Sequence, residues 1–188
     1  MRTLIVLLLA ATCCALDLAP LRADLQSDLY YQTLPAAVTA LVESPTPTAE
    51  VIAAFAAESD PLVQFNLVIV LGRRALRDPP PPTEERAEIL AFFAAGISHA
   101  HPWVRVESAY QLGRTGDAAQ LPALRAAYGD PSDFAFLHAV IAASTILGKL
   151  DPALTPEQME RLKQVHRIPN DNEGARRELD RLASTGLF

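Results

Sequence analysis

Histidines and carboxylates are the residues of this 188-residue chain that could catalyse a reaction or bind a metal. The four histidines include the alternating pair His99 and His101, which could hold a metal ion if a third ligand lay nearby. The sequence indicates no third ligand, so we interpret the pair as a polar turn in which His101 caps the next helix. Among the carboxylates, no spacing singles out a general acid and a general base.

Sequence motifs of common enzyme classes are absent. There is no glycine-rich phosphate loop, no nucleophile elbow and no paired-cysteine spacing. We therefore predict no catalytic residues, no cofactor and no bound metal. The formal net charge of −6 also argues against a nucleic-acid backbone as the partner.

The first fifteen residues have the pattern of a secretory signal peptide. Arg2 precedes an apolar run from Leu4 to Ala11, and small residues follow. A buried core helix is the alternative, whereas a membrane span would need about 20 apolar residues. Both cysteines, Cys13 and Cys14, lie in this segment, so the remainder has no disulfide framework. The pattern predicts export to the periplasm, the cell envelope or the medium.

The segment from Leu9 to Cys13 also resembles a bacterial lipoprotein signal. That resemblance implies a lipid on Cys13 and attachment to a membrane, in place of plain cleavage after Ala15. The sequence departs from the pattern at Thr12, where glycine or alanine is usual. We expect contact with a membrane only if Cys13 is lipidated.

Amino-acid composition and the positions of the prolines predict an all-α chain after residues 1–15. Its 32 alanines and its aromatic content of only 6% favour close helix packing over a β-sandwich. The 15 prolines fall mainly at helix starts and in connectors. A strand at Val68–Val70 is the alternative, but no period-2 alternation surrounds it. We predict helices over residues 21–32, 35–43, 48–58, 61–77, 83–95, 102–112, 118–128, 131–147, 156–166 and 173–184.

Three of these helices share a spacing that indicates a repeat. Leu71-Gly72 follows Asp60, and Leu112-Gly113 follows His101, by 11 and 12 residues in both copies, and Leu147-Gly148 repeats the ending. The glycines are 41 and 35 residues apart, within the range of stacked helical hairpins. We interpret these glycines as marking helix ends, except that the helix predicted over 61–77 has one further turn after Gly72.

The middle copy resembles the HEAT repeat family, in its short bacterial phycobilisome-lyase-type form. Val104-Arg105, Ala109 and Leu112-Gly113 fit the second helix of that repeat. The resemblance implies an α-α superhelix over residues 21–188, and Arg105 in a structural ladder between repeats. Repeats are expected at 48–77, 83–116 and 117–150, with a polar C-terminal cap at 155–185.

One face of the repeated helix carries more apolar residues than an exposed face should. In such stacks this face lines the concave surface, and it includes the only tryptophan. We expect a protein or peptide partner to bind there, or the chain to cover it with residues 21–32 or its C-terminal helices. The predicted partner-binding residues are Leu62, Phe65, Ile69, Trp103, Val106, Glu107, Tyr110, His138 and Ile141. Asn66, Ala142 and Thr145 share the same positions.

Three cations follow the Leu-Gly pairs, namely Arg73, Arg114 and Lys149. We interpret them as charges that stabilise helix C-termini, with a basic strip for an acidic partner as the alternative. Together these features predict an exported, non-catalytic interaction or assembly scaffold. The alternative is an enzyme or a lyase-like accessory protein. Nucleic-acid binding, known for basic concave faces, is disfavoured by the apolar face.

Overall fold

The computed structural model describes residues 16–25 and 36–166, and this part of the chain is helical without a strand. The helices are α1 (Ala19–Leu25), α2 (Ala36–Glu43), α3 (Thr48–Ala57), α4 (Pro61–Ala75), α5 (Thr83–Gly96), α6 (Pro102–Thr115), α7 (Leu121–Ala126), α8 (Asp133–Leu147) and α9 (Pro156–His166). Short 3₁₀ helices, Ala118–Gln120 and Ala127–Gly129, flank α7 where one continuous helix was predicted. The all-α prediction is confirmed. The predictions for residues 1–15, 26–32 and 173–184 lie outside the described residues.

Side-chain caps begin two helices where the sequence predicts them. The Asp60 carboxylate accepts a hydrogen bond of 2.8 Å from the backbone N–H of Leu62, in the first turn of α4. Thr155 and Gln158 form a reciprocal capping box at α9, with hydrogen bonds of 3.0 and 3.2 Å. Hydrogen bonds within the first turn therefore determine where α4 and α9 begin.

The start of α8 differs from the prediction. We expected it at Pro131, but the helix begins at Asp133 and is capped by the hydroxyl of Ser132. The Asp130 carboxylate accepts a hydrogen bond of 2.8 Å from the backbone N–H of Ser132, and it also accepts two, of 2.6 and 2.9 Å, from the guanidinium of Arg105. Asp130 thus combines a local turn before the helix with an ion pair to a residue distant in sequence.

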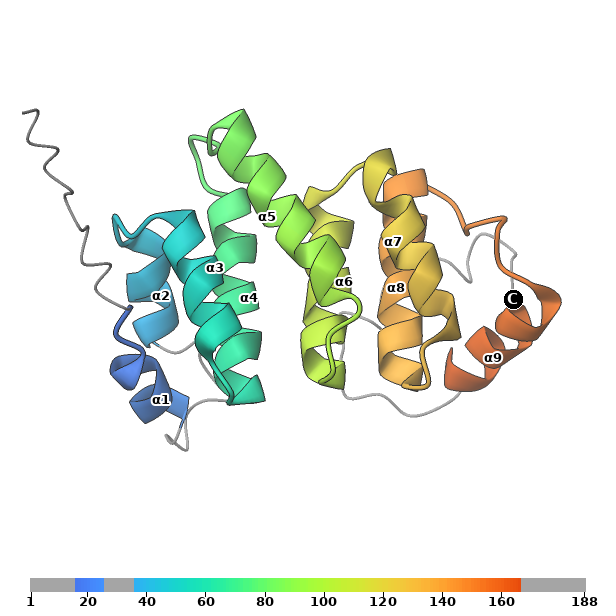
Figure 1. The fold of residues 1–188 in the computed structure, drawn as a ribbon. Helices are drawn as coiled ribbons and strands as arrows, with labels where there is room; N and C mark the ends of the chain where they lie inside the picture. The colour runs from blue at the N-terminus through green and yellow to red at the C-terminus, as the bar shows by residue number, and fades with distance from the viewer. Residues whose placement is uncertain (1–15, 26–35, 167–188) are drawn as a thin grey trace, which may run out of the picture.

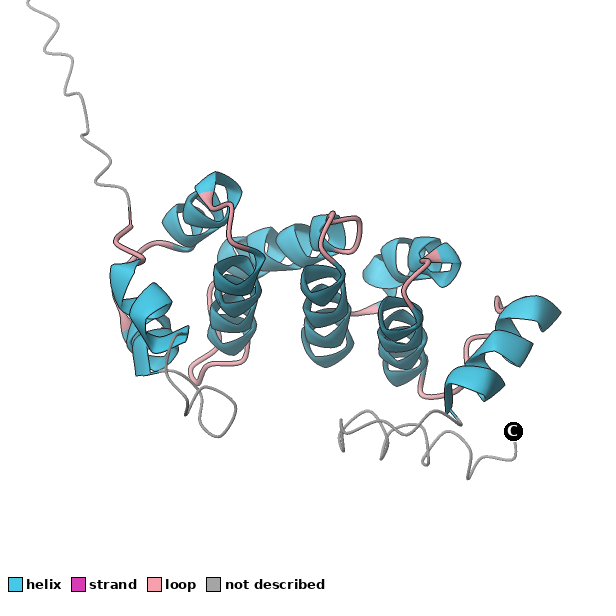
Figure 2. Cartoon of the chain, turned by 90° about the horizontal axis from the view of Figure 1, so that it is seen from below, coloured by secondary structure: helices cyan, strands magenta, loops and turns pink. Residues whose placement is uncertain are grey.

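The helices form two layers, as Figures 1 and 2 show. The first, here called the α4–α6–α8 layer, contains α2, α4, α6 and α8 in a row, with successive helices in contact. The second layer contains α3, α5 and α7, and α9 packs on α8 at the end of the stack. Consecutive helices pair across the layers as the hairpins α3–α4, α5–α6 and α7–α8.

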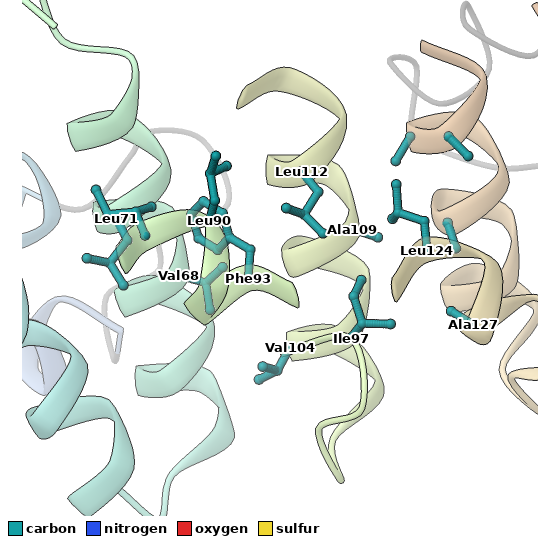
Figure 3. Close-up of a cluster of buried hydrophobic side chains, with 14 of the residues drawn as sticks. Val68, Leu71, Leu90, Phe93, Ile97, Val104, Ala109, Leu112, Leu124 and Ala127 are labelled. Atoms are coloured by element: carbon teal, nitrogen blue, oxygen red, sulfur yellow. The ribbon is translucent and has the colours of Figure 1, made fainter. Parts of the chain in front are cut away.

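A continuous apolar core fills the space between the layers, as expected when hairpins stack and share their buried faces. Figure 3 shows Leu90 and Phe93 of α5 beside Val68 and Leu71 of α4. Further along the stack, residues of α6 and α7 continue the same cluster. Val68 lies fully buried within α4, so the strand alternative at that run is wrong.

Two of the repeat glycines lie inside helices rather than at their ends. Helix α4 continues to Ala75 and α6 to Thr115, past Gly72 and Gly113. A Cβ on Gly113 would lie 3.0 Å from the Cα of Ala142 in α8. These glycines therefore allow neighbouring repeats to approach closely. The predicted role as a helix end is wrong for Gly113, whereas the predicted helix over 61–77 already extends past Gly72.

Gly148 does end its helix. It is the C-cap of α8 with φ of 67°, in the left-handed region that favours glycine. The third Leu-Gly pair thus differs in structural role from the first two, although it has the same sequence.

Arginine–aspartate pairs link segments that are distant in sequence. Besides its bonds to Asp130, Arg105 donates to the carbonyl oxygens of His99 and Ala100, both at 2.9 Å. This is the structural role expected for Arg105. In the next segment Arg125 donates to both carboxylate oxygens of Asp151, at 2.8 and 2.9 Å.

Replacing Asp151 with asparagine should destabilise the fold at neutral pH. The Asp151 side chain is fully buried and accepts hydrogen bonds from Arg125 and from the hydroxyl of Tyr128. The Arg125 guanidinium lowers the pKa of Asp151 to about 2. A carboxyl with a lowered pKa stabilises the fold above its ordinary pKa, and this contribution is lost as the pH falls toward 2. Because Arg125 is partly exposed, we expect a loss of roughly 1–2 kcal/mol at pH 7.

Urea denaturation of the wild type and Asp151→Asn between pH 7 and pH 2.5 measures this difference. The gap between the two free energies of unfolding should narrow as the pH falls. A gap that stays constant over this range would contradict a charged role for Asp151.

Candidate functional site

The structure exposes only part of the face that the sequence singled out. Trp103 is 54% exposed, Tyr110 44% and Leu62 38%. Four other members are half-buried, namely Phe65, Ile69, Glu107 and Ile141. Val106 and His138, in contrast, are only 6% and 7% exposed, so neither offers a surface to a partner.

Phe134 joins this face although the sequence analysis missed it. Its ring is 42% exposed and lies with its centroid 6.1 Å from that of Trp103, at an interplanar angle of 31°. The reason is the register of the third copy. Trp103 and Phe134 each occupy the second position of their helices, whereas alignment on the Leu-Gly pair matched Trp103 to His138. Alignment on the predicted helix starts, Pro102 and Pro131, would have matched Trp103 to Ser132 and missed Phe134 as well, because α8 begins at Asp133.

His138 lies beside Tyr110, with ring centroids 6.5 Å apart in an edge-to-face arrangement. Burial lowers the pKa of His138 to about 4, so the imidazole is neutral at pH 7. The His138 side chain therefore packs against the exposed ring of Tyr110 and offers no positive charge for a partner to bind.

The large exposed apolar side chains gather in one layer. Within the described residues they all lie on α4, α6 or α8, except Leu76, which is the C-cap residue directly after α4. We call this set the α4–α6–α8 aromatic surface; its members are Leu62, Leu76, Trp103, Tyr110 and Phe134. The α3–α5–α7 layer exposes no large apolar side chain among the described residues.

Glu107 lies on the same face of α6, one helical turn from both Trp103 and Tyr110. Its Oε1 accepts a hydrogen bond of 2.6 Å from the side-chain amide of Gln111. Burial raises the pKa of Glu107 to about 6. The surface thus combines exposed aromatic rings with a carboxylate that is poorly solvated.

Replacing Glu107 with glutamine should stabilise the free protein above pH 6. A carboxyl whose pKa is higher in the folded than in the unfolded chain favours folding when protonated, and its ionisation costs stability above the folded-state pKa. The difference between 4.5 and about 6 corresponds to roughly 1–2 kcal/mol. At pH 7.5 the Glu107→Gln variant should therefore be more stable than the wild type by that amount.

Chemical denaturation at pH 7.5 and pH 4.5 tests this expectation, with Glu88→Gln on the exposed side of α5 as the control. The Glu107→Gln gain should disappear at pH 4.5, and Glu88→Gln should change stability by less than about 0.5 kcal/mol at either pH. A loss of stability in Glu107→Gln at pH 7.5 would contradict the assigned pKa direction.

The histidine pair forms a turn, as interpreted, but the predicted side-chain cap is wrong. His101 occupies the N-cap position of α6 without a side-chain capping bond, and its backbone N–H donates to Nδ1 of His99 at 3.1 Å. Burial lowers the pKa of His99. Among the described residues, no group of three His, Cys, Asp or Glu side chains has the arrangement of a metal site.

A pocket of about 370 Å³ lies beside this turn, between the end of α5 and the start of α8. Its charged lining residues include Arg105 and Asp130, which form an ion pair with each other. These two charges of the pocket lining are therefore already paired with each other.

The three cations that follow the Leu-Gly pairs take different positions. Arg73 and Arg114 lie in the last turns of α4 and α6, where a positive charge stabilises the helix end. Arg114 also lies over the ring of Tyr110, 5.4 Å from its centroid. Lys149 follows the C-cap of α8 and is exposed.

Comparison with known proteins adds one finding. A family model described as HEAT repeats matches residues 48–145, just over half of the chain. No curated protein and no solved structure matches the chain. In the described part of the chain, the helices are too short or too polar to cross a membrane.

Proposed function

Because this chain belongs to the HEAT-repeat family, we propose that it is an exported, non-catalytic interaction scaffold that binds a protein or peptide on the α4–α6–α8 aromatic surface. The match to HEAT repeats supports a helical repeat scaffold for protein interaction. Fold alone does not define a function. The proposal therefore rests on the surface.

The segregation of exposed apolar side chains is the observation that carries the proposal. Single exposed apolar residues are common and need no explanation, whereas contiguous apolar surface marks an interaction site. Here Trp103 and Phe134 pack against each other while both rings remain about half exposed. Two helices of different repeats thus present one aromatic surface to the solvent.

The chemistry of this surface suits protein recognition. Tryptophan and tyrosine are frequent energetic anchors of interfaces, because each buries a large area at a small cost in conformational entropy. Tyr110 is positioned by His138 beneath it and by the guanidinium of Arg114 over its ring. A partner would therefore meet rings that are already oriented.

Affinity capture from the native cells tests the proposal. The full chain and the double variant Trp103→Ser/Phe134→Ser serve as baits, with Ala91→Ser on the exposed side of α5 as the control. We expect the wild type and the control to recover the same partner, and the double variant to lose it. Recovery of that partner by all three baits would contradict the proposed surface.

Export is the second part of the proposal and rests on residues 1–15. We expect the mature chain to begin at Leu16, after removal of the signal peptide. Mass spectrometry of the N-terminus of the protein from its native cells measures this. A lipid on Cys13 would replace plain cleavage by membrane anchoring and keep export. A chain that retains residues 1–15 without modification would contradict export.

A further inference from the structure

Glu107, which is half-buried, differs from the fully buried carboxylate side chains of the described chain. The side chains of Glu58, Asp130 and Asp151 are at most 6% exposed, and each forms an ion pair with an arginine. Glu107 is also desolvated, but it has no cation within ion-pair distance in the described part of the chain. Its hydrogen-bond partner is the neutral amide of Gln111.

A desolvated carboxylate without a cation costs stability, and it gains most from a positive charge brought into the same environment. The arginines nearest in sequence do not form an ion pair with Glu107 in the described part of the chain. The charge of Arg114 lowers the pKa of Glu107, but Arg114 lies over the ring of Tyr110 and beyond ion-pair distance of the carboxylate. Arg73 is exposed at the end of α4. The missing charge is therefore one that a partner could supply.

The position of Glu107 places this charge within the proposed interface. It lies on α6 between Trp103 and Tyr110, four residues after the first and three before the second. On one helical face this spacing puts a carboxylate between two exposed rings. A complementary segment would present a cation between apolar side chains.

We propose that the α4–α6–α8 aromatic surface binds a peptide segment that carries an arginine or lysine between apolar residues, with the cation paired to Glu107. This inference rests on the proposed function and specifies the chemistry of its partner. The apolar residues of the segment cover Trp103, Tyr110 and Phe134. The formal net charge of −6 on the whole chain favours the approach of a basic segment as well.

A selection from a random peptide library displayed on phage tests the inference. The targets are the full wild-type chain, Glu107→Gln, the double variant Trp103→Ser/Phe134→Ser and the control Glu88→Gln. Selection on the wild type and on the control should enrich arginine or lysine flanked by apolar and aromatic residues. Selection on Glu107→Gln should lose the basic residue and keep the apolar ones.

Synthetic copies of the most enriched peptide then give dissociation constants. Glu107→Gln should bind the peptide about tenfold more weakly than the wild type does. The same peptide with glutamine in place of its basic residue should bind both proteins equally. Equal affinity of the basic peptide for the wild type and Glu107→Gln, or enrichment of uncharged or acidic sequences, would overturn the basic partner and leave the proposed surface intact.

Two further outcomes would reject the surface itself. Unchanged peptide affinity in Trp103→Ser/Phe134→Ser, or the absence of any enriched sequence on the wild type, would overturn both the inference and the proposed function. If fluorescence quenching shows that Trp103 becomes more shielded as the protein concentration rises, without peptide, the surface binds a second copy of the chain. That result would overturn the proposal of a basic peptide partner.

Discussion

Replacing Gly113 with leucine is expected to lower the free energy of unfolding by about 3 kcal/mol, at the upper end of the usual cost of overpacking. Gly113 lies where α6 and α8 approach each other, and the nearest atom to a Cβ there would be the Cα of Ala142, at 3.0 Å. Because that atom belongs to the backbone, the helices must separate to admit a side chain. The separation would open the core between two repeats.

Thermal and urea denaturation measure this effect, with Gly129→Leu as the matched control. A Cβ on Gly129 would meet no atom within 4 Å, and its backbone lies outside the left-handed region. We expect Gly113→Leu to lower Tm by roughly 6–12 °C. Gly129→Leu should change stability by less than about 0.5 kcal/mol. Similar Tm values for the two variants would contradict the close approach of α6 and α8.

The double variant Trp103→Ser/Phe134→Ser is expected to weaken binding of the captured partner at least about thirtyfold, which corresponds to 2 kcal/mol or more for the loss of anchor residues. Both side chains are about half exposed in the free protein, so their removal should change the free energy of unfolding little. Binding and stability should therefore separate in this variant.

Titration of the purified partner by calorimetry, together with urea denaturation, tests this separation. Ala91→Ser on α5 is the control and should bind as the wild type does. Loss of binding that accompanies a large loss of stability would indicate a structural role for the two rings. Unchanged binding would place the partner elsewhere on the molecule.

The sequence predicts the helices well because their signals are local. Asp60 before Pro61 and the box of Thr155 and Gln158 act within one turn of the chain, and both predicted caps are present. Apolar residues at helical spacing likewise place Trp103 and Tyr110 on one side of α6. For such features, neighbours in sequence are neighbours in space.

Features that depend on contacts between helices were predicted less well. Gly113 has the sequence context of a helix end, but contact with Ala142 of α8 explains it. Phe134 was missed because the Leu-Gly pair of the third copy ends its helix while the other two pairs do not. Both errors have the same origin, since one sequence pattern serves two structural roles.

Arg74 is a further residue that sequence reasoning could not assign. It looks like another cation at the end of α4, yet it is 2% exposed. Its guanidinium donates to the carbonyl oxygens of Thr46 and Leu41, at 2.6 and 2.7 Å, and so fastens the α2–α3 connection to the stack. Only the packing of segments distant in sequence distinguishes it from its exposed neighbour Arg73.

Quenching of Trp103 fluorescence by acrylamide tests the central claim most directly, because Trp103 is the only tryptophan in the chain. We expect an accessible indole in the free full-length protein, in line with its exposed fraction of 54%. When a saturating basic peptide or the captured partner is added, the quenching constant should fall to roughly half or less, because the centre of an interface excludes solvent. An indole that is shielded in the free protein, or one whose quenching does not change in the complex, would contradict a partner-binding surface at Trp103.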